Sequence, residues 1–264
     1  MAEPSTEEKK EEAPAEEKVS NFPQRQGIRR GIYLLPNLVT TGALFAGFYA
    51  IIAAMSGSLE NAAIAIVIAG FLDSLDGRIA RMTNTSSEFG VQYDSLSDLV
   101  AFGVAPAVLM FSWILNDLGR IGWMVAFLYM ACAALRLARF NTAPDNRVFH
   151  GLASPAAAGT MATIVWTWVD NMDPVVGPEV AGPVAIVVGV LALLMVSNIR
   201  YYSPKQIDMH GRVPFMYLLV AVLLCVMIAM YPPGVLLAIG IVYGSSGPVM
   251  AIIRRRKIID TESY

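Results

Sequence analysis

The sequence predicts an all-α membrane protein, a polytopic bundle of about eight transmembrane helices. Of its 264 residues, 56 % are hydrophobic and 15 % are charged, a smaller charged share than soluble domains carry. The apolar residues fall into eight segments, each near the ~20 residues that a helix needs to cross a hydrocarbon layer of ~30 Å. The Lys and Arg residues gather before the first segment, after the last one and near the ends of the segments between them. These observations exclude an ordinary soluble domain.

Composition divides the chain into four regions. Residues 1–20 hold seven Glu and three Lys among Pro and Ala, which predicts a disordered acidic tail without the features of a cleavable signal. Residues 21–32 are basic and amphipathic, which predicts a juxtamembrane helix lying on the membrane surface, or a simple positive flank. Residues 33–253 contain the spans and form one transmembrane domain. Residues 254–264 begin with Arg-Arg-Arg-Lys and form a basic tail.

Prolines and charges set the character of the first three helices. Pro36 lies in the first turn of the first, where a helix tolerates it. The second is apolar only as far as Leu72 and the third only after Leu99, so the charged residues between them lie at a membrane boundary. Pro106 should kink the third helix because it has no backbone N–H. The expected helices cover residues 33–56, 61–82, 89–115, 121–141, 152–169, 181–201, 213–230 and 234–253.

The distribution of Lys and Arg predicts the orientation. Eighteen of the 19 lie in the N-terminal region, in the stretches after the second, fourth and sixth helices, or in the C-terminal tail. Only Arg120 lies on the other side. Positive residues favour the cytoplasm, so both termini and the polar ends of the second and third helices should be cytoplasmic. The expected location is the cytoplasmic membrane, crossed several times.

Four aspartates stand at these polar ends. In a helix, positions three, four and seven apart share a face, so the aspartates fall on two stripes. Thr85 and Glu88 have capping-box spacing and should restart the chain as a second, antiparallel helix. Carboxylates gathered in this way repel unless cations lie among them, and oxygen ligands suit Mg²⁺ or Mn²⁺. The stripes are Asp73, Asp76, Gly77 and Ala80 on one helix and Gly90, Asp94 and Asp98 on the other.

Such a cluster suits phosphoryl transfer at a membrane surface. Two divalent ions could neutralise a pyrophosphate and both ends of an in-line displacement. Gly77 and Ala80 leave room for a ligand near the helix backbone, and Arg81 offers a planar cation for phosphate. One aspartate less occupied by metal could accept the proton of an attacking hydroxyl.

The complete spacing resembles a known signature. Asp73-x2-Asp76-Gly77-x2-Ala80-Arg81-x8-Gly90-x3-Asp94-x3-Asp98 is similar, position for position, to that of the CDP-alcohol phosphotransferases. The family core has six transmembrane helices and some members add two, which matches the eight segments here. The resemblance implies that residues 33–253 are a catalytic domain and that the protein is a homodimer.

Three further stretches resemble the membrane-embedded CDP-diacylglycerol–serine phosphatidyltransferases, or phosphatidylserine synthases. That subfamily usually has Pro where Ala153 stands, a departure that bears on the loop and leaves Ser154 and Pro155 in place. The stretches are Leu35-Pro36-Asn37, Ala134-Leu-Arg136-Leu-Ala-Arg139-Phe140-Asn141 and Gly151-Leu-Ala153-Ser154-Pro155-Ala-Ala-Ala-Gly159.

The resemblance implies a role for each of these residues. A serine hydroxyl would attack the phosphorus that carries the lipid, and CMP would leave. Two ions, Mg²⁺ or Mn²⁺, would be held by Asp73, Asp76, Asp94 and Asp98, the last also serving as general base. The CMP part of the donor would be lined by Asn37, Thr40, Asp73, Gly77, Arg81 and Asp94. Beyond the resemblance, we hypothesise that Arg136, Arg139 and Ser154 form a polar pocket next to that phosphorus, where a guanidinium could hold the serine carboxylate. Arg200 or Lys205 could serve the same role or hold lipid phosphate.

The implied partners are a CDP-lipid, L-serine, the bilayer and a second copy of the chain, with no nucleic acid. Several alternatives stay open on sequence alone. The acceptor could be glycerol phosphate, inositol phosphate or choline, and the donor could be an archaeal ether lipid. Arg136 and Arg139 could simply flank a span and snorkel to the interface. A cation-coupled transporter would also carry intramembrane acids, but near the midplane and beside broken helices.

Overall fold

The structure is a computed structural model that describes residues 30–83, 87–142, 151–172, 177–199, 201 and 215–262. All secondary structure in these ranges is helical, which confirms the predicted all-α class. The elements are α1 (Arg30–Met55), α2 (Leu59–Thr83), α3 (Glu88–Asp98), η1 (Leu99–Val104), α4 (Ala105–Trp113), η2 (Leu115–Leu118), α5 (Arg120–Thr142), α6 (Ser154–Asn171), η3 (Pro178–Val180), α7 (Ala181–Val196), α8 (Phe215–Met230) and α9 (Pro232–Glu262).

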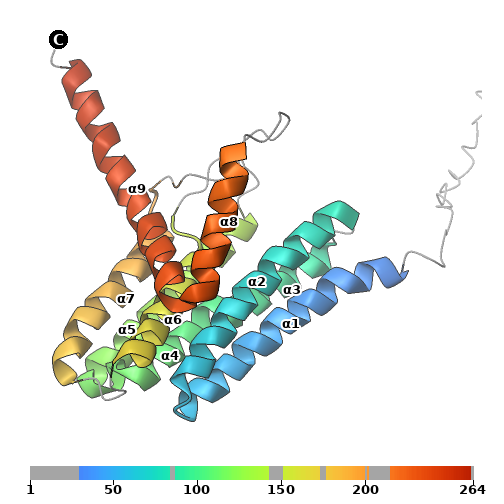
Figure 1. Ribbon diagram of the computed structural model, residues 1–264, viewed down its shortest axis with the longest axis horizontal. Coiled ribbons are helices and arrows are strands. Elements are labelled where there is room, and N and C mark those ends of the chain that lie inside the picture. The colour runs from blue at the N-terminus through green and yellow to red at the C-terminus, as the bar shows by residue number, and fades with distance from the viewer. Residues whose placement is uncertain are drawn as a thin grey trace, which may run out of the picture.

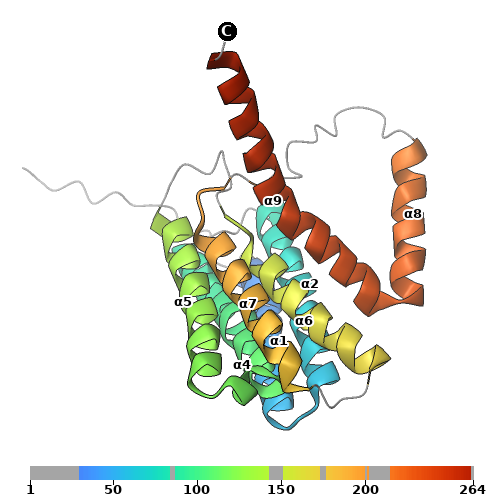
Figure 2. The ribbon, with the colours of Figure 1, turned by 90° about the vertical axis from the view of Figure 1, so that its left-hand side faces the viewer.

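Helices α1 to α7 form one bundle, with α9 packed against it and α8 held away from it (Figures 1 and 2). Five stretches of the described chain are long and apolar enough to cross a membrane, and α8 adds a shorter apolar helix. The protein is therefore a multi-pass helical bundle, while the count of eight spans stays a prediction. The five stretches are Leu35–Met55, Glu88–Trp113, Arg120–Thr142, Pro178–Val196 and Pro232–Ala251.

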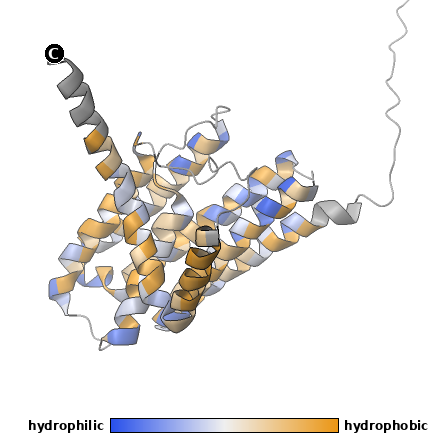
Figure 3. Cartoon of the chain, turned by 45° about the horizontal axis from the view of Figure 1, so that its top comes forward, coloured by the Kyte–Doolittle hydropathy of each residue, from blue (hydrophilic) through white to orange (hydrophobic). Residues whose placement is uncertain are grey.

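Small residues allow the helices to approach closely. Many of the fully buried positions are alanines, among them Ala50, Ala63 and Ala101. A Cβ added at Gly47 on α1 would lie 2.7 Å from Ala101 Cα on η1, a distance that real side chains do not adopt. Close helix packing of this kind replaces the hydrophobic effect inside a bilayer. Hydrophilic residues gather instead at one end of α2 and α3 (Figure 3).

The third predicted helix is present but irregular. Its α-helical bonding gives way to π-helical bonding over η1, immediately before Pro106. Pro106 cannot donate to the Phe102 carbonyl four residues earlier. The buried Tyr129 on α5 donates its hydroxyl to that carbonyl at 3.1 Å. The predicted disturbance at Pro106 is thus a π-helical segment whose freed carbonyl has a partner on the next helix.

Tyr129→Phe should lower the free energy of unfolding by about 1–3 kcal/mol, because it leaves the buried Phe102 carbonyl unsatisfied. Thermal unfolding of the purified protein in detergent measures the change. The matched control is Tyr49→Phe, since Tyr49 is 46 % exposed on α1. Equal stability of the two variants would contradict this role for the hydroxyl.

The chain between α5 and α6 is tied to the end of α7 just before Ser154. Gly151 donates its N–H to the Ile199 carbonyl at 2.9 Å, and Leu152 donates to the Leu194 carbonyl at 3.0 Å. Gly151 has φ 80°, and a Cβ there would lie 2.2 Å from the Met195 carbonyl oxygen. Ala153 has φ −62° and ψ 133°, a backbone that proline itself would adopt. Alanine at position 153 therefore has the same backbone conformation that the usual proline would have.

Some predicted boundaries were wrong and others lie outside the described residues. Helix α7 ends at Val196, five residues before the predicted end, because the chain turns at Ser197 into an extended conformation. Helix α9 continues through the predicted basic tail as far as Glu262. Residues 1–20, most of the predicted juxtamembrane segment, Arg200 and Lys205 lie outside the described residues.

Candidate active site

The turn between α2 and α3 brings the two aspartate stripes together. Helix α3 begins at Glu88 with Ser87 as its N-cap, whose hydroxyl accepts the Gly90 N–H at 3.0 Å. The predicted cap at Thr85 was therefore wrong by two residues. The predicted consequence holds, because the chain reverses and α3 runs beside the polar end of α2 (Figure 1).

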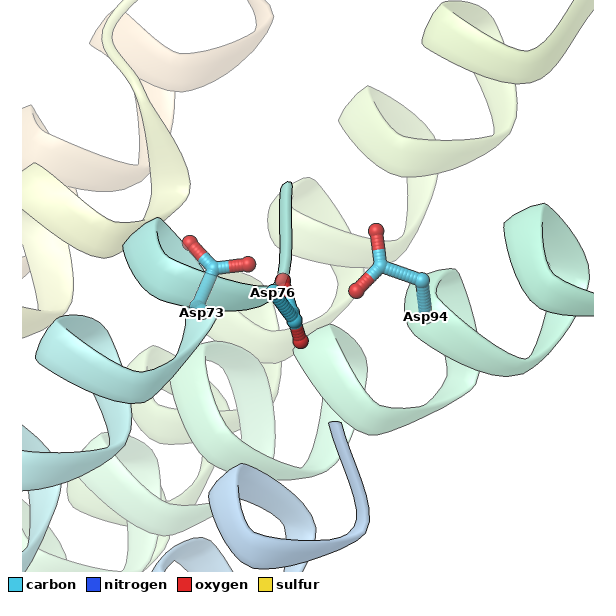
Figure 4. Close-up of side chains that lie close together, drawn as sticks. All are labelled: Asp73, Asp76 and Asp94. Carbon is cyan, nitrogen blue, oxygen red and sulfur yellow. The ribbon is translucent and has the colours of Figure 1, made fainter. Parts of the chain in front are cut away.

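Three of the aspartates form a compact cluster. Asp73, Asp76 and Asp94 each offer a carboxylate oxygen within 4.8 Å of the others. Asp73 and Asp94 point toward one another across the space between α2 and α3, with Asp76 between them (Figure 4). Such an all-oxygen, triply anionic donor set fits a hard divalent cation. The cluster could bind metal.

The fourth aspartate extends the cluster toward the bundle interior. Asp98 is the last residue of α3, and its carboxyl group hydrogen-bonds the Asp73 carboxyl. Two carboxylates that close repel unless a proton or a cation lies between them. Asp98 also interacts electrostatically with the Arg136 guanidinium on α5. Asp98 is therefore linked to the three-aspartate cluster through Asp73 and is close enough to Arg136 for the two charges to interact.

Helix α1 closes one side of the site. The buried Thr40 hydroxyl lies 2.8 Å from Asp76 Oδ2 and 3.0 Å from the Pro36 carbonyl, and its single proton serves one acceptor at a time. The Thr40 carbonyl accepts a bond from the Ser97 hydroxyl at 3.2 Å, which fixes α1 against α3. A cavity of about 90 Å³ opens here, lined by Pro36, Asn37, Thr40, Asp76, Gly77, Ala80, Ser87, Gly90, Val91 and Asp94.

The small residues of the signature keep this cavity open. A Cβ at Gly77 would meet no atom within 4 Å, so a side chain there would project into free space beside the aspartates. A Cβ at Gly90 would lie 3.5 Å from Asn37 Oδ1, so the side-chain amide of Asn37 on α1 is close to α3. Arg81 donates its Nε to the Gly77 carbonyl at 2.9 Å, one turn beyond the cluster. The structure thus brings Asn37, Thr40 and Gly77 to the three aspartates.

A second polar group lies beside Asp98. Arg136 Nη1 donates to the Ser154 hydroxyl at 3.0 Å, and Ser154 is fully buried at the start of α6. Arg136 Nε is also buried, and it has no hydrogen-bond partner in the described part of the chain. An arginine with an unused buried donor is suited to bind an anionic ligand.

Arg139 lies in a different setting from Arg136. It is exposed, and its Nη2 donates to Asn198 Oδ1 beyond the end of α7 at 2.9 Å. Ser95 and Asn141 form a similar bond between α3 and α5 at 3.0 Å. The structure therefore brings Arg136 and Ser154 together and places Arg139 in an exposed contact with Asn198.

Sequence reasoning missed two residues that the geometry brings in. Ser97 lies between Asp94 and Asp98 in the sequence and is buried, and its hydroxyl bonds the Thr40 carbonyl of α1. Tyr243 on α9 lines a crevice together with Pro155 and Ala156, the residues that follow Ser154. Ser97 could have been found from its place inside the motif, whereas nothing in the sequence relates Tyr243 to it.

The comparisons with known proteins agree with this arrangement. Residues 33–196 match the model of a family described as CDP-alcohol phosphatidyltransferase. That range includes the four aspartates, Arg136 and Ser154. The chain belongs to the CDP-alcohol phosphatidyltransferase family. The resemblance of the aspartate signature is thus confirmed, and with it the class of enzyme.

Several curated relatives are similar to this chain over about two thirds of its length. A CDP-diacylglycerol–serine O-phosphatidyltransferase of Helicobacter pylori is 38 % identical over 179 residues, 67 % of this chain and 75 % of the relative. One from Bacillus subtilis is 32 % identical over 175 residues, 65 % of this chain and 92 % of the relative. An archaetidylserine synthase of Methanothermobacter thermautotrophicus is 35 % identical over 170 residues, 63 % of this chain and 69 % of the relative.

Proposed function

We propose that the protein transfers the phosphatidyl group of CDP-diacylglycerol to L-serine, giving phosphatidylserine and CMP. The observation that carries this proposal is the position of the Arg136–Ser154 pair beside the aspartate cluster. The cluster suits the phosphoryl chemistry of the family, and the arginine offers a site for the carboxylate of an amino-acid acceptor. Relatives named for serine transfer support the same acceptor.

Divalent metal belongs to this proposal because the donor set fits it. Asp73, Asp76 and Asp94 would hold Mg²⁺ or Mn²⁺, and Asp98 would complete the set for two ions. When bound, the ions would neutralise the pyrophosphate and the charge that develops on the leaving group. Without them the four carboxylates would repel an anionic donor.

The protein's own residues would orient the donor and move a proton. Asp98, the last residue of α3, would accept the proton of the serine hydroxyl. The hydroxyl oxygen would then bond to the lipid-bearing phosphorus as the bond from this phosphorus to the bridging oxygen breaks. CMP would leave with the bridging oxygen and its electron pair. Thr40 fixes Asp76 through its hydroxyl and so orients one carboxylate before the donor arrives.

The proposed donor site has a polar and an apolar part. Asn37, Thr40, Gly77 and Arg81 would surround the CMP portion, with Asp73 and Asp94. An apolar crevice of about 320 Å³ lies between α2, α6 and α9 and begins near Gly70, one turn before Asp73. Its lining is mostly apolar, which suits an acyl chain while the headgroup stays at the aspartates.

Serine would bind on the inner side of Asp98. Its carboxylate would pair with Arg136, whose Nε is buried without a partner among the described residues. Ser154 would hold the other end of the guanidinium, as it does here. Arg139 is the weaker candidate for this role because its Nη2 already bonds Asn198. Arg200 and Lys205 remain candidates for the acceptor or the lipid phosphate.

One alternative has specific support. The archaetidylserine synthase among the relatives carries serine in its name together with an archaeal lipid. Donors with ether-linked or ester-linked chains present the same CDP headgroup, so the aspartate site would accept either. Acceptors with their own phosphate would require more cationic side chains than the Arg136–Ser154 pair supplies. A cation-coupled transporter is disfavoured because the aspartates cluster in the polar parts of α2 and α3.

The proposal places the reaction at the cytoplasmic face of the cell membrane. The excess of Lys and Arg on the aspartate side of the spans supports this orientation. Homodimerisation, which the family resemblance implies, is part of the same proposal.

The test uses the purified full-length protein in detergent with Mg²⁺ or Mn²⁺ and CDP-diacylglycerol. CMP release is measured with L-serine, glycerol 3-phosphate, inositol phosphate and choline in parallel, and again with the ether-linked donor. Serine should give the highest rate, and phosphatidylserine should appear in equal amount to CMP. A faster rate with any other acceptor would refute the serine assignment while retaining the reaction class.

A further inference from the structure

Two apolar spaces meet on helix α9, which lies outside the residues that match the family. The crevice of about 320 Å³ between α2, α6 and α9 begins near Gly70, one turn before Asp73. A larger cavity of about 850 Å³ lies between α8 and α9. Ile239 and Tyr243 line both spaces. The two spaces therefore adjoin along the side of α9, and the smaller one leads toward the aspartates.

The larger cavity is a wedge that is bounded at one end by the turn between α8 and α9. The two helices are joined at Tyr231 and diverge from there, with α8 standing away from the bundle (Figure 2). A Cβ at Gly234 would meet the Tyr231 ring, so the turn is tightly packed. Asn171 at the end of α6 donates its Nδ2 to the Tyr231 hydroxyl, which fixes the turn to the bundle. From Gly234 the cavity follows α9 as far as Met250, a length of roughly 24 Å at the rise of an α-helix.

Both spaces present apolar walls, although their linings include hydroxyl groups. The Thr160 and Thr163 hydroxyls each donate to a carbonyl of their own helix, α6, at 2.8 Å. The Ser246 hydroxyl donates to the Tyr243 carbonyl one turn earlier in α9 at 2.6 Å. Hydroxyl groups engaged in this way with their own backbone offer little to a polar ligand. None of the described residues that line the two spaces is charged, so the walls suit hydrocarbon chains.

We propose that the two spaces receive the two hydrocarbon chains of the donor lipid, one between α2, α6 and α9 and the other between α8 and α9. This inference rests on the proposed function of the site. The two chains of CDP-diacylglycerol separate at the glycerol, next to the phosphate at the aspartates, and two adjoining spaces match that branching. Lipid tails gain no hydrophobic energy on moving from a bilayer to a protein wall, so packing decides which chains fit. The pair of helices α8 and α9 would thereby select donors by the number and bulk of their chains.

The first test compares Val242→Trp with Ile241→Trp, a matched control. The two residues are neighbours on α9 and are 70 % and 56 % exposed, but Val242 lines the larger cavity and Ile241 lines neither space. In Val242→Trp the KM for CDP-diacylglycerol should rise about tenfold, because the added ring overpacks a space that the second chain fills. The KM for CDP-monoacylglycerol, which has one chain, should stay unchanged because the smaller crevice remains open. Ile241→Trp should change neither KM.

The second test locates the chains in the wild-type protein, so it does not depend on the folding of a variant. Two CDP-diacylglycerol probes each carry a diazirine at the end of one chain, and the labelled peptides are identified by mass spectrometry. One probe should label α2 or α6, and the other should label α8 or the part of α9 around Val242. Excess CDP-diacylglycerol should remove both labels, whereas the same concentration of phosphatidylglycerol should remove less because it lacks the CDP group.

Several results would overturn the assignment of the larger cavity. Equal KM changes in the two variants, or two probes that both leave α8 and Val242 unlabelled, would remove the second chain from it. A label that phosphatidylglycerol displaces as well as CDP-diacylglycerol does would assign the cavity to ordinary membrane lipid. Label on α8 in the monomer but not in a dimer would assign it to a second copy of the chain. A wild-type protein that releases no CMP with any acceptor would instead refute the proposed function, so the two failures are distinguishable.

Discussion

Asp98→Asn should reduce the turnover number by about 10²–10⁴, the range expected when a general base is removed. Asparagine keeps the shape of the side chain but cannot take up the proton of the acceptor hydroxyl. The variant should still fold and bind the CDP donor, because Asp73, Asp76 and Asp94 retain their cluster without it. Single-turnover CMP release and donor binding by isothermal titration measure the two properties separately.

The control for this substitution is Asp117→Asn. Asp117 is an exposed carboxylate in η2, at the end of the bundle away from the aspartate cluster. It should turn over as the wild type does. Near-normal turnover of Asp98→Asn would reject Asp98 as the base. Loss of donor binding in step with turnover would assign Asp98 to the metal site alone.

Removal of divalent ions should abolish CMP release, and adding Mg²⁺ or Mn²⁺ back should restore it. The physical reason is that four carboxylates without counterions repel the pyrophosphate of the donor, at distances where the local dielectric screens little. The measurement is CMP release after exhaustive treatment with EDTA, followed by titration with each ion. Equilibrium binding of Mn²⁺ to the wild type should give two ions per chain.

Asp94→Asn serves as the matched variant for the ion measurement. It removes one charge from the cluster of three and should weaken Mn²⁺ binding, whereas Asp117→Asn should leave it unchanged. Full activity after complete chelation would rule out the metal-assisted reaction. Tight Mn²⁺ binding that survives in Asp94→Asn would place the ions elsewhere in the chain.

The site around the aspartates could be predicted because its chemistry is local. Asp73 and Asp76 share a face through helical spacing alone, and so do Asp94 and Asp98. A single reversal of the chain then brings the two faces together, so a cap misplaced by two residues did not affect the prediction. Thr40 was also within reach, because α1 and α2 are joined by a short turn and pack along their length.

The acceptor side could be predicted only in part. Arg136 and Arg139 lie three residues apart and look equivalent in sequence, yet one bonds the buried Ser154 and the other an exposed Asn198. The difference comes from the hydrogen bonds of Gly151 and Leu152 to the end of α7, which position Ser154. Contacts between segments so far apart in the chain produce no periodic pattern in the sequence from which they could be predicted. The position of Tyr243 beside Pro155 and Ala156 is unpredictable for the same reason.

The π-helical segment η1 joins α3 and α4 into one long rod and sets the rotation of α4 about the rod axis relative to α3. A π turn contains about one residue more than an α turn, and each residue of an α-helix turns the chain by about 100°. Rewinding the same residues of Leu99–Val104 as regular α-helix, with none removed, would rotate everything beyond them by roughly 100° relative to Asp98. Leu109 and Met110 would then leave the core while Asp98 stayed in place. By taking up one extra residue, the wide turn thus keeps the aspartates and the packing surface in register on a single rod.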